Sequence, residues 1–130
     1  MKLTIKILTI CLVGLISHLP VIAAPLSVPP KEVFAGHKLI EDWSISEAES
    51  FTNALLKKYP KSGDAYFLKA RVEFLKGNYE YTAKILTQVG RNHGEVNKFR
   101  ELVEATHKTT KSFTTKESEH FIYRFQQGPD

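Results

Sequence analysis

Apolar side chains recur three or four positions apart over most of the chain after residue 31, which places them on one face of a helix. Polar residues and helix breakers separate five such segments. We therefore predict five helices, over residues 32–42, 46–59, 64–76, 79–89 and 95–107. The third segment is apolar over much of its circumference, so we expect other helices to cover it on two sides.

Residues at the ends of these segments indicate where the helices begin and end. Ser46 and Glu49 match the capping-box pattern, which satisfies free N–H groups at a helix start. Pro60 lacks a backbone N–H and ends the second helix, and Gly77 ends the third. Trp43 follows the first helix, where we expect it to act as a hydrophobic staple or cap between helices.

The tail after the helices has a different pattern. Residues 108–117 are polar and rich in threonine and lysine, whereas residues 119–125 alternate, with Phe121, Tyr123 and Phe125 on one side. Such alternation is typical of a strand. A single strand without a partner is not stable alone. We therefore predict an all-α fold with one C-terminal β-strand that has nothing to pair with.

The first residues match the pattern of an export signal. Lys2 and Lys6 precede an apolar run over residues 7–16, and small residues follow near Ala23. The run has about ten residues, whereas a membrane span needs about 20. We expect a signal peptide over residues 1–23, cut near Ala23, so that the mature chain is secreted or periplasmic and meets a membrane only during export.

Proline, charge and cysteine content limit the rest of the chain. Residues 24–31 are proline-rich and predict an extended linker. The net charge is +4, from 18 Lys and Arg against 14 Asp and Glu, and it falls to +2 without Lys2 and Lys6. So small a charge does not favour nucleic-acid binding. The single cysteine, Cys11, lies in the signal, so we expect no disulfide in the mature chain.

Small residues recur at a distance of 34 positions. Gly36 and Ala70 occupy the middle of the first and third predicted helices, and Ala48 and Thr82 lie in the second and fourth. Small side chains let paired helices approach closely, and stacked helix pairs share a core that one pair cannot bury alone. A period of 34 residues is known from helical-repeat proteins. A helical bundle with a chance offset of this size is the alternative.

The second of these units resembles the tetratricopeptide repeat (TPR). It has an aromatic residue at Tyr66, a small residue at Ala70 and a Gly77-x-Tyr79 opening of its second helix, and Pro60 matches the proline that closes the preceding repeat. The resemblance covers about half of the chain and implies about two repeats with a capping helix. The repeats would span residues 29–62 and 63–96, and the cap would begin at Glu95.

Several positions depart from that family's pattern. Lys69 and Glu73 stand where large apolar residues are usual, and Thr82 replaces an alanine. Trp43 stands at the place of a glycine, and Gly94 stands where a proline is common. The chain is therefore a degenerate match to the family.

The resemblance also implies a binding groove. In the family, the first helices of successive repeats line a concave surface where an extended or helical peptide could lie, held by apolar anchors and, here, by Arg71 for a carboxylate. The residues of this chain that would face the groove are Val33, His37, Ile40, Asp64, Phe67, Arg71 and Phe74. The expected partner is a protein or a peptide.

The tail resembles a second family. Residues 118–125, with the Gly128-Pro129-Asp130 ending, are similar to the opening strand of peptidase-MA-like (gluzincin) metallohydrolase domains, which follow tetratricopeptide repeats in exported bacterial proteins. That family binds zinc through an H-E-x-x-H motif on a later helix, and none of the five histidines here is followed by glutamate. The resemblance implies the N-terminal piece of such an enzyme. The alternative is a tail strand that pairs with some other partner.

These observations predict four segments and a function without chemistry. We see no catalytic motif, metal site or cofactor site, and expect an exported protein–protein interaction module that is not an enzyme. The alternative function is the N-terminal fragment of an exported zinc metallohydrolase whose active site is missing. The segments are a signal peptide over 1–23, a linker over 24–31, a TPR-like domain over 32–107, and a linker with an orphan strand over 108–130, which could open a truncated second domain.

Overall fold

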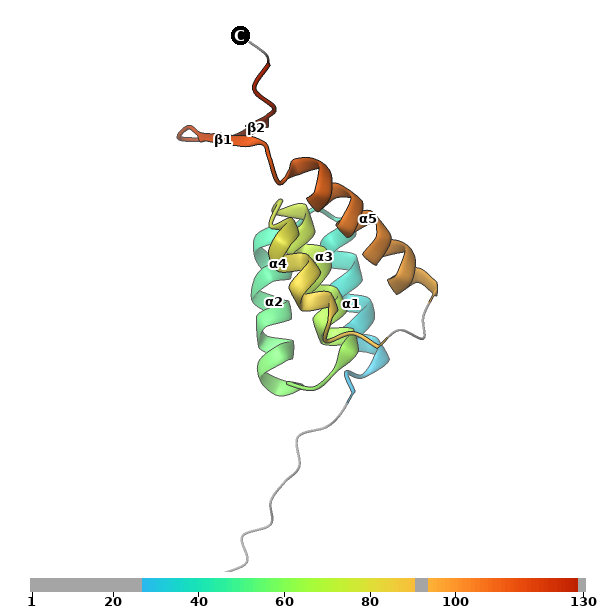
Figure 1. Ribbon diagram of the computed structural model, residues 1–130. Helices are drawn as coiled ribbons and strands as arrows, with labels where there is room; N and C mark the ends of the chain where they lie inside the picture. The colour runs from blue at the N-terminus through green and yellow to red at the C-terminus, as the bar shows by residue number, and fades with distance from the viewer. Residues whose placement is uncertain (1–26, 91–93, 129–130) are drawn as a thin grey trace, which may run out of the picture.

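The computed structural model describes residues 27–90 and 94–128, and within them five helices precede two short strands (Figure 1). The helical part of the predicted all-α fold is therefore confirmed. The predicted signal peptide and its cut near Ala23 lie outside the described residues. The elements are α1 Pro30–Glu41, α2 Ile45–Lys58, α3 Gly63–Leu75, α4 Tyr79–Leu86, α5 Gly94–Thr110, β1 Thr114–Glu117 and β2 Ile122–Phe125.

The helices lie close to the predicted ranges and differ at their ends. α1 already begins at Pro30, inside the predicted linker, because the fixed φ and missing N–H of proline suit a first helical position. α4 ends early, at Leu86, and the Val89 N–H closes a turn on the Leu86 carbonyl instead. α5 runs beyond its predicted end to Thr110, whose hydroxyl donates to the carbonyl of Thr106 one turn earlier, at 2.8 Å.

The predicted capping box at the start of α2 is wrong. α2 begins at Ile45, after Ser44, whose side chain makes no capping bond, so Ser46 lies inside the first turn. The Glu49 carboxylate instead accepts a hydrogen bond from Lys76 at the end of α3, at 2.6 Å. Glu49 therefore joins the two halves of the helical body and does not cap a helix.

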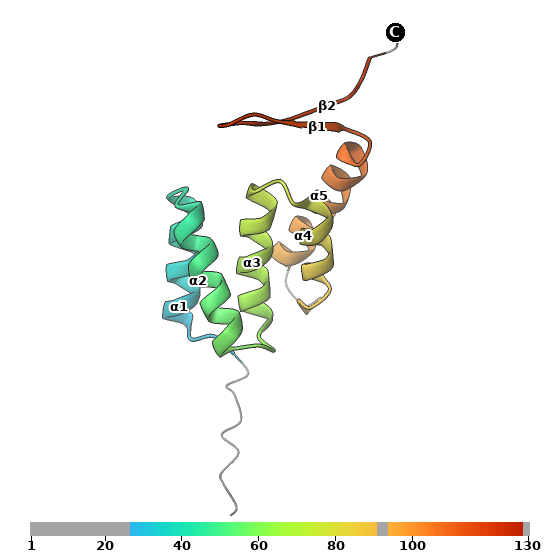
Figure 2. The same cartoon turned by 90° about the vertical axis from the view of Figure 1, so that its left-hand side faces the viewer.

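The first four helices form two hairpins, α1–α2 and α3–α4, that lie side by side (Figure 2). α3 packs against α1, α2 and α4, and α5 packs against α4. Leu68 and Val72 of α3 join one apolar core, with residues of α1 and α2. Phe67 and Ala70, on another side of α3, join a second core with residues of α4 and α5. The prediction that this helix is covered on two sides is confirmed.

The turns inside the two hairpins share an uncommon backbone conformation. Trp43 has a φ of 56°, and Gly77, 34 residues later, has a φ of 77°. Glycine adopts this left-handed region freely, whereas a side chain there costs about 1–2 kcal/mol. Trp43 is also 73% exposed. The prediction that Trp43 packs between helices as a staple or cap is therefore wrong.

The prediction of a single, unpaired strand is also wrong. β2 pairs with β1 in an antiparallel sheet, from Thr114 opposite Phe125 to Glu117 opposite Ile122. β1 has the sequence TTKE and is mostly exposed, so it shows none of the apolar alternation from which a strand is predicted. The hairpin projects from the end of α5, beside the helices (Figure 2).

Among the described residues, none of the helices combines the length and the apolar content that crossing a membrane requires.

Candidate functional site

A continuous groove runs along α1, α3 and α5. A cavity of about 510 Å³ lies between these helices and shares Phe67 and Glu95 with a second cavity of about 620 Å³. The second cavity shares His37 and Asp64 with a third, of about 390 Å³, near the start of α1. Because neighbouring cavities have lining residues in common, they form one surface, which we call the α1/α3/α5 groove.

All seven residues predicted to face a groove line the α1/α3/α5 groove. Ile40 and Phe67 are buried in it, whereas Asp64 at the start of α3 is exposed. The half-buried members are Val33, His37, Arg71 and Phe74. The structure thus brings the predicted residues together, and their binding of a partner stays a prediction.

Arg71 and His37 connect α3 and α1 across the groove. The Arg71 guanidinium donates to His37 Nδ1, and because arginine has only donors, that ring nitrogen carries no proton. Burial lowers the pKa of the His37 imidazole, and the nearby Arg71 charge lowers it further, so the ring is neutral near pH 7. Arg71 forms no ion pair with a described carboxylate. Its remaining donors are therefore available to a ligand.

Aromatic rings from α3 and α5 meet inside the groove. Phe99 of α5 lies edge-on to Phe67 and to Phe74, with ring centroids 5.7 Å and 5.4 Å apart. The sequence-based prediction omitted Phe99 and its neighbour Leu102, because it treated the last helix only as a cap. Their three-residue spacing on one helical face was the signal that could have identified them.

Exposed apolar side chains gather at the end of the groove next to the α1–α2 turn. Trp43, Leu75 and Leu102 are all exposed and line the same cavity. Glu95 and Lys98 of α5 line it as well, and neither forms an ion pair with another described residue. The groove therefore offers apolar surface together with unpaired charge, an arrangement that suits non-covalent binding of a polypeptide.

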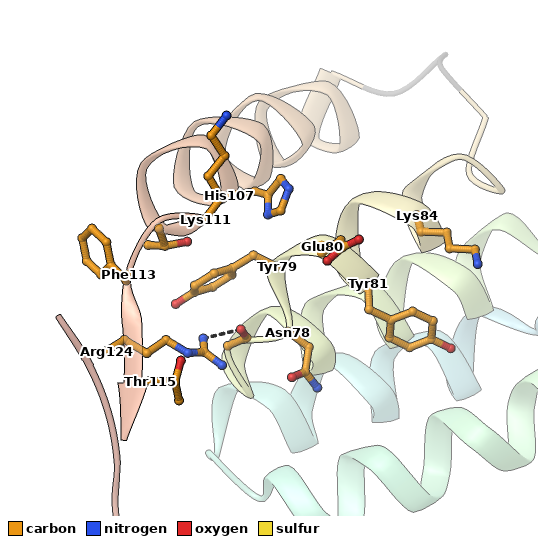
Figure 3. A pocket seen from close by; sticks show the side chains of 12 residues that line it. Asn78, Tyr79, Glu80, Tyr81, Lys84, His107, Lys111, Phe113, Thr115 and Arg124 are labelled. Carbon is orange, nitrogen blue, oxygen red and sulfur yellow. Dashed lines mark hydrogen bonds between the residues drawn. The ribbon is translucent and has the colours of Figure 1, made fainter. Parts of the chain in front are cut away.

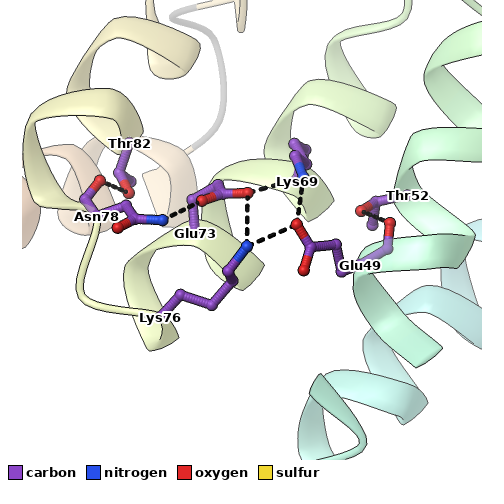
Figure 4. A network of polar contacts seen from close by, with 7 residues as sticks. All are labelled: Glu49, Thr52, Lys69, Glu73, Lys76, Asn78 and Thr82. Atoms are coloured by element: carbon purple, nitrogen blue, oxygen red, sulfur yellow. Dashed lines mark hydrogen bonds and ion pairs between the residues drawn. The ribbon is translucent and has the colours of Figure 1, made fainter. Parts of the chain in front are cut away.

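A cluster of buried charges lies between the two helical hairpins (Figure 4). Lys69 and Glu73 of α3 are both buried and form an ion pair of 2.7 Å. Asn78 Nδ2 donates to Glu73 at 2.6 Å, and Lys76 Nζ donates to Glu49 of α2 at 2.6 Å. Buried charge is costly unless it is paired and hydrogen-bonded, and each charge here has a partner. Pairing across the cluster explains how charged residues can occupy positions where apolar ones were expected.

The cluster lowers the pKa of both of its carboxyls. At Glu49 the hydrogen bond from Lys76 is the main cause, and the same bond raises the pKa of the Lys76 ammonium. At Glu73 burial opposes ionisation, but hydrogen bonds from Lys69 and Asn78 outweigh it, so the pKa lies below the ordinary value. Carboxylates held ionised in this way are poorly suited to exchange protons near pH 7, so we assign the cluster to joining helices.

No three His, Cys, Asp or Glu side chains within residues 27–90 and 94–128 gather closely enough to hold a metal ion. Comparison with family models, with curated proteins and with solved structures finds no match for this chain. The function of the groove therefore has to follow from its own residues.

Proposed function

We propose that this chain is an exported, tetratricopeptide-like interaction module that binds a protein or peptide in the α1/α3/α5 groove and has no catalytic activity of its own. The observation that carries the proposal is the groove, which joins buried aromatic rings, exposed apolar side chains and unpaired charges. Apolar anchors of a peptide would bury against Phe67, Phe74 and Phe99. A carboxylate of the peptide would accept the remaining donors of Arg71.

Equivalent positions in the two helical hairpins support the repeat. Gly36 and Ala70, 34 residues apart, are both buried, and so are Ala48 and Thr82 at the same spacing. The two left-handed turn residues described above also have this spacing. Small buried residues let the helices of each hairpin pack closely, and stacked hairpins with a shared core are the general plan of helical repeats.

Peptide selection tests the groove directly. Short random peptides displayed on phage are selected against the mature chain, and their affinities are then measured by calorimetry for the original chain and for Arg71→Gln and Leu102→Glu. We expect Arg71→Gln to weaken binding about tenfold, because a charge-assisted hydrogen bond contributes about 1.5–3 kcal/mol. Leu102→Glu should weaken binding at least as much, since it places a charge in an apolar contact.

The matched control is Asn53→Glu on the exposed surface of α2, which adds the same charge as Leu102→Glu away from the groove. It should change affinity by no more than about twofold, as expected for an exposed charge outside the contact. Selected peptides that bind all four proteins equally, or a library that yields no binding peptide, would contradict the proposed groove function.

Export is tested separately from binding. The protein recovered outside the cytoplasm of an expressing bacterium is sequenced from its N-terminus, and we expect the first residue to be Ala24. A protein that keeps Met1 and stays in the cytoplasm would remove export from the proposal and would leave the groove untouched.

The β1–β2 hairpin favours one second candidate, the N-terminal part of an exported zinc metallohydrolase. Phe121 and Tyr123 are exposed although they stand on or beside a sheet, which fits a sheet that further elements of a longer product would cover. The mass and zinc content of the natural product distinguish the candidates. A zinc-containing product well above 14.8 kDa favours the enzyme, and a zinc-free product of at most this mass contradicts it.

A further inference from the structure

The β1–β2 hairpin exposes three large apolar side chains that are consecutive in the chain. Phe121, Ile122 and Tyr123 are 63%, 58% and 53% exposed. A two-stranded sheet is at best marginally stable by itself, and unpaired strand edges are templates for pairing with another chain. The hairpin therefore has both an uncovered face and uncovered edges in the part of the chain that the structure describes.

One face of the hairpin is turned toward the helices. Thr115 and Arg124 stand opposite each other on β1 and β2, and both line a cavity of about 600 Å³ that α4 and α5 also border (Figure 3). Because successive side chains of a strand point to opposite faces, Tyr123 and Phe125 lie on the other face. The Phe121 ring lies beside Tyr123, with ring centroids 6.1 Å apart. The face turned away from the helices is thus aromatic.

The backbone pattern identifies which groups of β2 are free. The Ser118 N–H donates to the Phe121 carbonyl at 2.8 Å, which makes these two residues a hydrogen-bonded pair next to the loop. Such pairs alternate along an antiparallel ladder, so Tyr123 bonds to β1 while Ile122 and Arg124 direct their N–H and C=O groups outward. Among the described residues, no backbone group pairs with the outward groups of Ile122 and Arg124.

The hairpin is fixed to the helical body by one side chain. The Arg124 guanidinium donates to the carbonyl of Gly77 in the α3–α4 turn and lies over the Tyr79 ring, 5.4 Å from its centroid (Figure 3). Gly77 has no side chain, and a Cβ atom there would collide with this guanidinium. The open edge of β2 is therefore held in a defined place, which lowers the entropic cost of pairing with a further strand.

Charge indicates what kind of strand fits. β2 contains Arg124 and no acidic residue, and Lys84 and Lys111 line the same cavity against one carboxylate, Glu80. A second copy of β2 would bring another arginine to this edge and no acid to balance it. An acidic residue on the incoming strand, opposite Arg124, would meet complementary charge.

We propose that the outer edge of β2 binds an extended strand from another polypeptide, in which apolar residues alternate and a carboxylate stands opposite Arg124. The outward N–H and C=O groups of Ile122 and Arg124 supply the pairing, and the aromatic face supplies apolar contact. This site lies apart from the α1/α3/α5 groove and does not depend on it.

Amide hydrogen exchange read by NMR tests the site, with a capped synthetic peptide in which valine alternates with threonine and one central threonine is replaced by glutamate. At saturating peptide we expect exchange at Ile122 and Arg124 to slow about tenfold or more, while Tyr123, already bonded to β1, changes less. The same peptide with lysine in place of glutamate should bind about tenfold more weakly. Unchanged exchange at Ile122 and Arg124 would overturn the proposal.

Two variants separate the edge from other causes. Ile122→Pro removes an outward N–H that β1 does not use, whereas Ile122→Thr keeps it, so the peptide should bind the threonine variant about fivefold or more tightly. Leu102→Glu should bind this peptide as the original chain does, which distinguishes the site from the groove. Protection of Ile122 that rises with protein concentration without any peptide would instead show self-association and contradict the proposal.

Discussion

Gly36 lies in the middle of α1, where glycine is usually unfavourable, and its neighbours explain its presence. A Cβ atom at this position would stand 2.7 Å from Leu68 Cδ1 and 3.2 Å from the Phe51 ring. Leu68 is fully buried, so its side chain has little room to move away. The glycine costs about 1 kcal/mol in helix propensity relative to alanine, and in return α1 can approach α2 and α3.

We expect Gly36→Ala to destabilise the protein by about 1–2 kcal/mol, because the overpacking of a filled core outweighs the gain in helix propensity. The free energy of unfolding in urea measures the change. Gly94→Ala is the matched control, since a Cβ atom there meets nothing within 4 Å, and it should be neutral or slightly stabilising. Equal effects of the two substitutions would show that the close approach at Gly36 is not limiting.

The buried pair of Lys69 and Glu73 supports a second prediction. Lys69→Met leaves the Glu73 carboxylate buried without its nearest cation, so we expect a loss of about 3 kcal/mol or more in unfolding free energy. The double variant Lys69→Met/Glu73→Leu removes both buried charges and should recover most of that loss. Chemical denaturation of the single and double variants measures both effects. A double variant no more stable than the single one contradicts this account of the pair.

Among the elements, the helices could be predicted from the sequence and the β1 strand could not. Helical periodicity is strong wherever one face is buried, as along α2, so the five helices are identified even though their ends shift. β1 buries almost nothing, so its pairing with β2 leaves no apolar pattern in the sequence. Phe99 of α5 was missed as a groove residue because its proximity to α3 depends on packing across helices.

The charge cluster that joins α2 and α3 makes stability depend on pH. The folded-state pKa values of Glu49 and Glu73 lie below their ordinary values, so these groups contribute stability that is fully present above about pH 5. That contribution is lost as the pH falls through the folded-state pKa values, when both carboxyls become protonated. We therefore expect the unfolding free energy to fall between about pH 5 and pH 3.

The measurement is urea unfolding at several pH values across this range. Glu73→Gln should flatten the dependence, because the variant has one fewer carboxyl with a lowered pKa, although it also lowers stability at neutral pH. Glu47→Gln, an exposed substitution in the first turn of α2, is the control and should keep the original slope. If Glu73→Gln and Glu47→Gln show the same slope, the cluster does not account for the acid sensitivity.

On the scale of the whole molecule, α3 is the central element. It contributes to both apolar cores, to the charge cluster with α2, and to the groove with α1 and α5. The seven groove residues could be proposed from the sequence because the helical period and the 34-residue spacing place them on equivalent faces. The third wall of the groove could not, because the position of α5 over that face depends on tertiary packing.

The most direct test of the central claim is an NMR titration of the mature chain with a peptide selected against it. If the α1/α3/α5 groove binds the peptide, the largest amide shifts will occur at His37, Phe67, Arg71 and Phe99, while residues on the exposed surface of α2, such as Asn53, will shift little. Shifts confined to α2, or to the β1–β2 hairpin, would contradict the claim that this groove is the binding surface of the helical module.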